Sequence, residues 1–388
     1  MLGSNKVSLS EICDLIPGFA FKSQDFTNTC DKVIKIADIQ PPYVFHKDLK
    51  SVNISGYKKE KLAKFIAKSG DLVLAMTGAT IGKLGRLQRG HAYVNQRVLL
   101  LKPKENIDKD YFYYSLLGVN FQKFILNHID SQTAQPNISA TTIGKYTIPI
   151  PSLEEQKRIG KILRSLDRKI ELNLEINDNL SKLMSLLFQI KVIKNPDIEK
   201  WNKLPLTDIA NYKNGLAMQR YRPKEGEPGI PVLKIKELGQ GTCSIDSEHC
   251  SENIDKTVIV YDGDVIFSWS GTLLVKVWTG GKAGLNQHLF KVTSETYPKW
   301  FYFLWTLHHL ENFVAIAAAK ATTMGHIKRK DLELSEVFVP PKEEFDHLNK
   351  VFSPLLNKII AIGIENRKLI EIRDLLLKKL MGELEANR

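Results

Sequence analysis

The chain repeats one ordered series of short sequence motifs, and this duplication restricts its architecture more than any other feature. The matched segments, first copy before second, begin at Leu9 and Leu206, Val33 and Val232, Gly70 and Gly263, Asn95 and Asn286, Tyr111 and Phe301, and Pro151 and Pro340. The copies are offset by about 190 residues, whereas solenoid and propeller repeats recur every roughly 20 to 50 residues. The 388 residues therefore predict two similar domains rather than an array of small repeats.

Each copy has the pattern of a mixed α/β domain. The runs VIKIADI from Val33 and DLVLAM from Asp71 are short, apolar and rich in β-branched residues, so both predict strands. The stretch 108–129 changes to helical spacing, with large apolar side chains at Tyr111, Tyr114, Leu117, Phe121, Phe124 and Ile125. Such a stripe packs into a core more often than it stacks on bases, and we expect a helix that faces inward.

A long helix is predicted after each domain. Apolar residues follow a heptad pattern at Ile159, Leu163, Leu166, Ile170, Leu180, Met184 and Leu187, and again at Leu348, Phe352, Leu355, Ile359, Ile362, Leu369 and Leu376. Asn173 and Asn177 lie on the first seam, and Asn366 lies on the second at the position equivalent to Asn177. Because a polar residue in an apolar seam fixes register, we expect the helices to pair; a helix packed only on its own domain is the weaker alternative.

These elements predict an α+β protein with two similar domains, in which the two long helices pair as a coiled coil. We expect a first domain over residues 1–151, a helix over 152–195, a second domain over 196–340 and a second helix over 341–388. Each helix would have about 40 residues and a length of roughly 60 Å.

The charge distribution favours an anionic partner for the first domain. The net charge is +12, and residues 1–150 carry 20 Lys and Arg against 12 Asp and Glu, while residues 196–340 carry 17 of each sign. A solvated basic surface without a polyanion is the alternative. We expect a cytoplasmic protein, because no apolar run or signal-peptide pattern is present, and reduced thiols at Cys13, Cys30, Cys243 and Cys250.

The motifs resemble, in their order and over essentially the whole chain, those of the specificity subunits of type I restriction-modification systems. The resemblance rests on GDVIFSWSGTLLVKVWTGGKAGLNQHLFKV from Gly263, GDLVLAMTGATIGKLG from Gly70 and IPIPSLEEQKRIGKIL from Ile148. It implies two target-recognition domains that each read half of a split DNA sequence. It also implies that the two helices set the gap and form an antiparallel coiled coil with pseudo-twofold symmetry. It further implies two docked methyltransferase subunits and additional endonuclease subunits. The second copy departs from the first at Phe345, which replaces Gln156.

Candidate DNA contacts follow from side-chain chemistry. Basic residues around the Gly-rich turn suit phosphates or guanine edges, and nearby amides suit adenine edges, with a solvated loop or capped turn as the alternatives. In the first domain the candidates are Lys83, Arg86, Arg89, Arg97, Gln132, Gln135 and Asn137. In the second they are Arg220, Arg222, Lys276, Lys282, Lys328 and Arg329.

Motifs of enzymes are weak in this sequence. Gln40–Tyr43 (QPPY) is similar to the catalytic loop of amino-methyltransferases, but a turn at a strand end is the better interpretation. Cys243, His249 and Cys250 do not have the spacing of a zinc site. We therefore expect no catalytic residue, cofactor or metal in this chain, with S-adenosylmethionine, ATP and Mg²⁺ on partner subunits. A basic coiled-coil scaffold, or a DNA-binding protein without a split target, is the alternative function.

Overall fold

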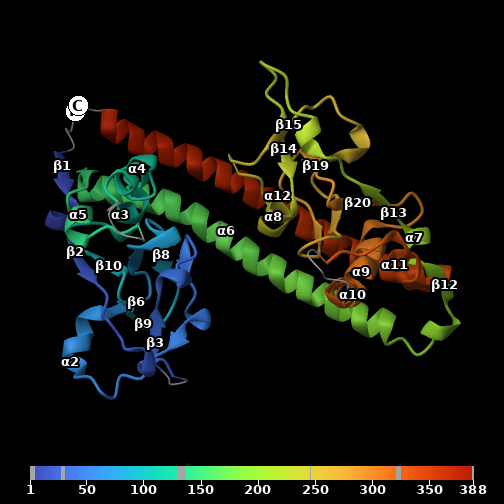
Figure 1. The fold of residues 1–388 in the computed structure, drawn as a ribbon, viewed down its shortest axis with the longest axis horizontal. Coiled ribbons are helices and arrows are strands. Elements are labelled where there is room, and N and C mark those ends of the chain that lie inside the picture. Colours follow the sequence, from blue (N-terminus) through green and yellow to red (C-terminus); the bar gives the residue numbers. More distant parts are fainter. Residues whose placement is uncertain (1–4, 28–30, 130–135, 245, 320–324, 387–388) are drawn as a thin grey trace. The chain divides into compact units, whose positions relative to one another are not determined.

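The computed structural model describes residues 5–27, 31–129, 136–244, 246–319 and 325–386. The chain divides into two compact units (Figure 1). Unit 1 comprises Met1–Asp167 with Ile372–Arg388, and unit 2 comprises Arg168–Glu371. Each unit therefore contains one globular domain and a stretch of both long helices.

In its described residues, the domain of unit 1 contains three sheets. The first sheet has the strand order β2(Cys13–Pro17)-β10(Val98–Pro103)-β7(Leu72–Ala75)-β8(Leu84–Leu87)-β4(Tyr43–Val44). The second has the order β5(Lys50–Ser51)-β3(Lys32–Ile34)-β9(His91–Val94)-β6(Ile66–Lys68). The third pairs β1(Asn5–Ser8) with β11(Thr147–Ile150). Short helices connect them: α1(Leu9–Ile12), α2(Lys59–Leu62), α3(Lys109–Ser115), α4(Val119–Asn127) and α5(Ala140–Gly144). Strand β10 pairs antiparallel with both β2 and β7, whereas β3 and β9 are parallel.

The domain of unit 2 repeats this topology, except that its first sheet has no counterpart of β4 among the described residues. The first sheet has the strand order β13(Asn211–Asn214)-β20(Leu289–Thr293)-β17(Val265–Ser268)-β18(Leu274–Val277). The second has the order β15(His249–Cys250)-β14(Ile230–Leu233)-β19(Ala283–Leu285)-β16(Ile259–Val260). The third pairs β12(Asn202–Pro205) with β21(Glu336–Val339). Its short helices are α7(Leu206–Ile209), α8(Ile235–Gln240), α9(Lys299–His308), α10(Leu310–Ala319) and α11(Arg329–Glu333). The predicted duplication and the α+β class are confirmed.

The two long helices are α6 (Leu153–Phe188), which continues as a π-helical turn to Ile193, and α12 (Lys342–Ala386). Within unit 2 they are antiparallel, because Asn173 contacts Asn366 while Asn177 contacts Ile359, earlier in α12. Pro354 lies inside α12, where it cannot donate the backbone hydrogen bond of a helix interior.

The asparagines of the two helices make equivalent contacts within unit 2. The side-chain amide of Asn177 donates to the carbonyl of Ile359 at 3.2 Å, and that of Asn366 donates to the carbonyl of Ile170 at 3.4 Å. Donors and acceptors are related by the same offset of about 190 residues that relates the motifs. The repeat thus extends to single hydrogen bonds between the helices.

The aromatic stripe of the first domain lies in the core, as predicted, but not on one helix. Tyr111 and Tyr114 on α3 and Phe121 and Ile125 on α4 are fully buried. The chain leaves helical geometry between the two helices, and Gly118 becomes the N-cap residue of α4. The single helix predicted for 108–129 is therefore wrong, because glycine disfavours a helix interior.

The strand predicted at VIKIADI is also shorter than expected. Strand β3 ends at Ile34, and Ile36–Asp38 forms a 3₁₀ turn, in which the Asp38 carboxylate accepts a hydrogen bond from the Lys35 amide at 2.8 Å. A short acidic side chain that bonds to a nearby backbone amide competes with pairing in a sheet. The prediction for DLVLAM is confirmed by β7.

Gln156 and Phe345, at equivalent positions near the starts of the two long helices, make different contacts. Gln156 is buried, accepts from the Asp108 amide and donates to the Pro151 carbonyl, both at 3.0 Å. Phe345 instead packs against Trp300 and Phe301, at centroid distances of 5.7 and 5.1 Å. One copy thus holds its helix by hydrogen bonds at this position, and the other holds it by aromatic packing.

Candidate nucleic-acid interface

Backbone hydrogen bonds join three loops at one end of the first domain's sheet. The Met76 amide donates to the Arg97 carbonyl at 2.9 Å, the Gly78 amide to Pro136 at 3.0 Å and the Ile138 amide to Met76 at 3.0 Å. We call residues 76–83, 95–97 and 136–138 the first loop cluster. Segments distant in the sequence therefore meet around the Gly-rich turn.

The second domain has the same arrangement at equivalent positions. The Trp269 amide donates to the His288 carbonyl at 3.4 Å, the Gly271 amide to Gly325 at 3.1 Å and the Ile327 amide to Trp269 at 3.1 Å. We call residues 269–273, 286–288 and 325–327 the second loop cluster. Its backbone frame is shared, but its side chains differ: Thr77, Arg97 and Asn137 correspond to Ser270, His288 and His326.

A glycine fixes the central turn in each cluster. A Cβ atom on Gly18 would lie 2.1 Å from the Asn95 carbonyl oxygen, and one on Gly215 would lie 2.3 Å from that of Asn286. No other residue permits so close an approach of two backbone segments. The turn that carries Arg97 or His288 is therefore placed by backbone contacts, independently of the side chain that it presents.

Three of the residues predicted in the first domain belong to the first loop cluster. Lys83 and Arg97 are exposed there, and Asn137 pairs with Thr77 in an isolated β-bridge. Arg97 has a φ of 72°, the left-handed region that side chains other than glycine rarely adopt, and such backbone strain is typical of functional positions. Gln132 and Gln135 lie outside the described residues.

Arg86 and Arg89 do not join this cluster. Arg89 is exposed in the turn that follows β8, about 20 Å from Lys83 at the rise of an extended strand. The Arg86 guanidinium lies 2.5 Å from the Asp110 carboxylate and 4.5 Å from the centroid of the Tyr113 ring, with 11% of its side chain exposed. Arg86 thus holds β8 to α3 and is poorly placed for DNA.

The basic residues predicted in the second domain are more dispersed. Lys276 donates to the Gly239 carbonyl at 2.7 Å, and burial lowers the pKa of its amine. Lys282 pairs with Glu252 at 2.6 Å, and this hydrogen bond raises the pKa of the lysine. Exposed positions are held by Arg220, Arg222, Lys328 and Arg329. Lys328 and Arg329 follow the second loop cluster directly, and Arg329 lies 3.8 Å from Glu333.

The second loop cluster contains an aromatic group that the sequence analysis missed. The Trp269 indole donates to the Asn214 side-chain oxygen at 3.0 Å, and its ring lies 5.9 Å from that of His288. Nδ1 of His288 lies 3.0 Å from the Ser270 hydroxyl. Beside this group is an open pocket of about 370 Å³, lined by Trp269, Asn214, Phe290 and Arg329 among others. The equivalence of His288 to Arg97 was the signal in the sequence that could have identified it.

The remaining sequence predictions concern enzymatic motifs and cysteines. Gln40 and Tyr43 exchange backbone hydrogen bonds of 3.0 and 2.8 Å in a tight turn before β4, which confirms the interpretation of QPPY as a turn. Cys13, Cys243 and Cys250 are free thiols, and Cys30 lies outside the described residues. In the part of the chain that the structure describes, no three His, Cys, Asp or Glu residues are grouped to hold a metal ion. No helix among the described residues is long and apolar enough to cross a membrane.

Comparison with known proteins places both halves in one family. The model of the type I restriction modification DNA specificity domain matches residues 1–182 and again 198–374. The chain belongs to the type I restriction-modification specificity subunits. As in that family, its two target-recognition domains stand in tandem, each followed by a long helix.

Individual members of the family show how far the likeness extends. The MjaIX specificity subunit of Methanocaldococcus jannaschii is 25% identical over 81% of this chain and 78% of its own length. The EcoBI specificity subunit of Escherichia coli is 22% identical over 98% of this chain and 86% of its own. The crystal structure of a type I S subunit from M. genitalium shares the fold, with a TM-score of 0.60, 16% identity and coverage of 97% and 96%.

Proposed function

We propose that this specificity subunit reads a split DNA sequence, with each loop cluster contacting one half and the paired helices fixing the gap. The observation that carries the proposal is the shared backbone frame of the two clusters, which presents different side chains at equivalent positions. A constant frame with variable loops suits two readers of different sequences. Arg97 suits a guanine edge, whereas His288 and Trp269 offer ring surfaces.

The long helices are proposed to bind two copies of a methyltransferase subunit. In unit 2, Leu172, Ile176, Leu183 and Leu186 are exposed on α6, within an arc of about 80° at the helical period. Leu183 and Leu186 correspond to Ile372 and Leu375 of α12 in unit 1, which are 46% and 67% exposed. Exposed apolar residues at equivalent positions of both helices support two docking surfaces of one kind.

Catalysis is assigned by this proposal to the partners. The methyltransferase subunits would bind S-adenosylmethionine, and endonuclease subunits would use ATP and Mg²⁺, while this chain would carry no reacting group. A methyltransferase that acts on a base must turn it out of the duplex, and the specificity subunit would determine where this happens. Because its target is genomic DNA, the proposal places the complex in the cytoplasm.

The test is to co-express the chain with its cognate methyltransferase subunit and to sequence the methylated DNA. We expect one split motif with a constant gap. Exchanging residues 1–150 for the first domain of a related subunit should change one half of the motif and leave the other half and the gap unchanged. The absence of any split motif, with a stable complex formed, would favour a basic scaffold or a DNA-binding protein without a split target.

A further inference from the structure

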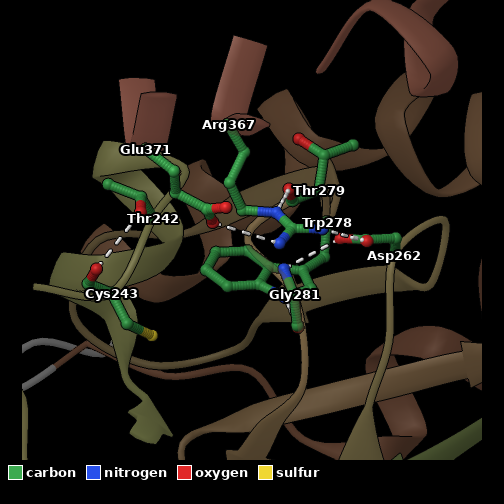
Figure 2. Close-up of polar contacts among 8 residues, drawn as sticks. All are labelled: Thr242, Cys243, Asp262, Trp278, Thr279, Gly281, Arg367 and Glu371. Atoms are coloured by element: carbon green, nitrogen blue, oxygen red, sulfur yellow. Dashed lines mark hydrogen bonds and ion pairs between the residues drawn. The ribbon is translucent and has the colours of Figure 1, made fainter. Parts of the chain in front are cut away.

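Beyond the apolar packing around Phe352, one arginine joins the second recognition domain to α12. Arg367, on α12, donates to the Asp262 carboxylate at 2.6 Å and to the Thr279 carbonyl at 3.2 Å, and lies 3.5 Å from Glu371 (Figure 2). Arg367 and Asp262 have 28% and 23% of their side chains exposed, so the pair is only partly screened by water. The guanidinium therefore joins the helix to two separate loops of the domain.

The turn that Arg367 contacts is itself held rigidly. The second Asp262 oxygen accepts from the Gly281 amide at 2.8 Å, and the buried Trp278 indole donates to the Gly281 carbonyl at 2.6 Å. In Figure 2 the Trp278 ring lies beneath the guanidinium, with Asp262 to one side. Because both oxygens of one carboxylate are used, the ion pair and the turn cannot move independently.

The backbone of α12 also fits closely against this turn. A Cβ atom on Gly363, one turn before Arg367, would lie 2.6 Å from the Thr279 hydroxyl oxygen and 2.8 Å from its methyl carbon. The helix surface at Gly363 and the side chain of Thr279 are therefore complementary in shape. This contact opposes sliding of the turn along the helix, while the Arg367 pair opposes rotation away from it.

The first copy lacks both charges of this arrangement. Ser69 occupies the position equivalent to Asp262, and its hydroxyl donates to the Gln88 carbonyl at 3.1 Å. Asp178 occupies the position equivalent to Arg367, and it pairs with Lys182 on its own helix. The shared fold therefore does not require the Arg367–Asp262 pair, which points to a role specific to the second domain.

We propose that Arg367 is a positioning residue that fixes the orientation of the second recognition domain on α12 and so restricts the length of the DNA gap that the subunit accepts. This inference rests on the proposed function. Loops on the domain read the DNA half-site. A small rotation of the domain at its attachment to α12 therefore moves those loops. Without Arg367 the half-motifs stay the same, but gaps one base pair shorter or longer are accepted.

The experiment compares Arg367→Met, Arg367→Lys and Asp262→Asn with the wild type, each in complex with the methyltransferase subunit. The substrates carry both half-sites at the native gap and at gaps one base pair shorter and longer. Asp262→Asn retains an oxygen for the Gly281 amide while removing the charge, and Arg367→Lys retains the charge but cannot contact Asp262 and Thr279 together. Lys368→Met, at the exposed neighbouring position, is the matched control.

Arg367→Met is expected to lower the preference for the native gap about fivefold, as for the loss of a partly buried ion pair, with unchanged half-motifs. Arg367→Lys and Asp262→Asn should give smaller losses, and Lys368→Met none. Equal preference in wild type and Arg367→Met would overturn the inference.

Hydrogen exchange at the Gly281 amide gives a second readout that needs no DNA. Exchange should be about tenfold faster in folded Arg367→Met than in the wild type, and an unchanged rate refutes the attachment. If the wild type itself shows no split motif, the proposed function fails, and the exchange rate alone decides whether Arg367 holds the turn.

Discussion

The side-chain amide of Asn173 donates a hydrogen bond of 2.9 Å to the amide oxygen of Asn366 on the facing helix, and it donates a second one to the Glu365 carboxylate. Both residues are almost fully buried, with 2% and 6% of their surfaces exposed. Two helices that slide by one turn would lose this bond and bury both amides unpaired. The pair therefore favours a single alignment of the helices over alternatives that apolar contacts alone would tolerate.

Replacing one asparagine of this pair should lower the free energy of unfolding more than replacing both. We expect Asn366→Leu to lower the free energy of unfolding by about 1 kcal/mol, because the Asn173 amide loses one of two partners and keeps the Glu365 carboxylate. The double variant with Asn173→Leu should recover most of that loss. Urea denaturation of the four proteins in a double-mutant cycle measures the coupling, and strictly additive effects would contradict it.

The first domain should be sensitive to the loss of Arg373. Asp167, which is 5% exposed, accepts from Tyr114 at 2.5 Å and from Arg373 at 3.0 Å. Arg373→Met leaves this carboxylate buried without its cation and should cost about 3 kcal/mol of unfolding free energy in unit 1.

Unit 2 supplies the matched control for this variant. The positions equivalent to Tyr114, Asp167 and Arg373 are occupied by Leu304, Leu356 and Met184, all buried in one apolar core. Introducing these three residues together into unit 1, as Tyr114→Leu, Asp167→Leu and Arg373→Met, should restore stability to near the wild-type value. A triple variant as unstable as Arg373→Met would show that apolar packing cannot replace the contacts among Tyr114, Asp167 and Arg373.

The stability of unit 2 should depend on pH through Glu171. Burial, with repulsion from Glu175 one turn away, raises the pKa of Glu171 to about 7; Arg168, 3.1 Å away, is more than half exposed and opposes this only weakly. Because the folded pKa lies above the unfolded value, the folded state binds the proton more tightly. Stability should therefore fall as the pH rises from about 4.5 to 7, and Glu171→Gln should flatten this dependence in thermal melts. A variant with the wild-type slope would contradict the assignment.

The side chain at position 97 should determine part of the first half-motif. Arg97→Ala should relax the base preference at one position and weaken binding by about 1–3 kcal/mol, as for the loss of a bidentate contact with guanine. Lys83→Ala is the comparison. Loss of a phosphate contact should reduce the slope of the log binding constant against log salt concentration by about one, without changing the motif. Methylation sequencing and binding at several salt concentrations distinguish them. An unchanged motif in Arg97→Ala would remove this residue from base recognition.

Charges on the exposed helix surfaces should remove the partners one at a time. Leu186→Asp and Leu375→Asp should each reduce the complex to one methyltransferase subunit, and the double variant should bind none. Native mass spectrometry measures these stoichiometries directly. Leu174→Asp, an exposed residue on the opposite side of α6, should leave two subunits bound.

Much of the fold followed from the sequence because duplication, heptad spacing and β-branched runs are local or periodic signals. The failures were also local: Gly118 ended a helix that the apolar spacing alone would have continued, and Asp38 turned a strand into a 3₁₀ turn. Candidate DNA contacts were harder to predict, because charge alone does not reveal a partner such as the Asp110 of Arg86. Trp269 and His288 were missed because neither is a lysine, an arginine or an amide, although alignment of the two copies places His288 at the position of Arg97.

The core of the first domain is completed by residues from the far end of the chain. Leu376, Leu377, Leu380 and Met381 of α12 pack against the cluster that contains Ile159 and Leu163. At roughly 5–20 residues per second, the ribosome reaches them on the order of 10–40 seconds after Asp167. During that interval the newly made first domain exposes apolar surface that α12 later covers. A product that stops before α12 should thus remain a target for chaperones and proteases, so that only chains containing α12 survive to select DNA.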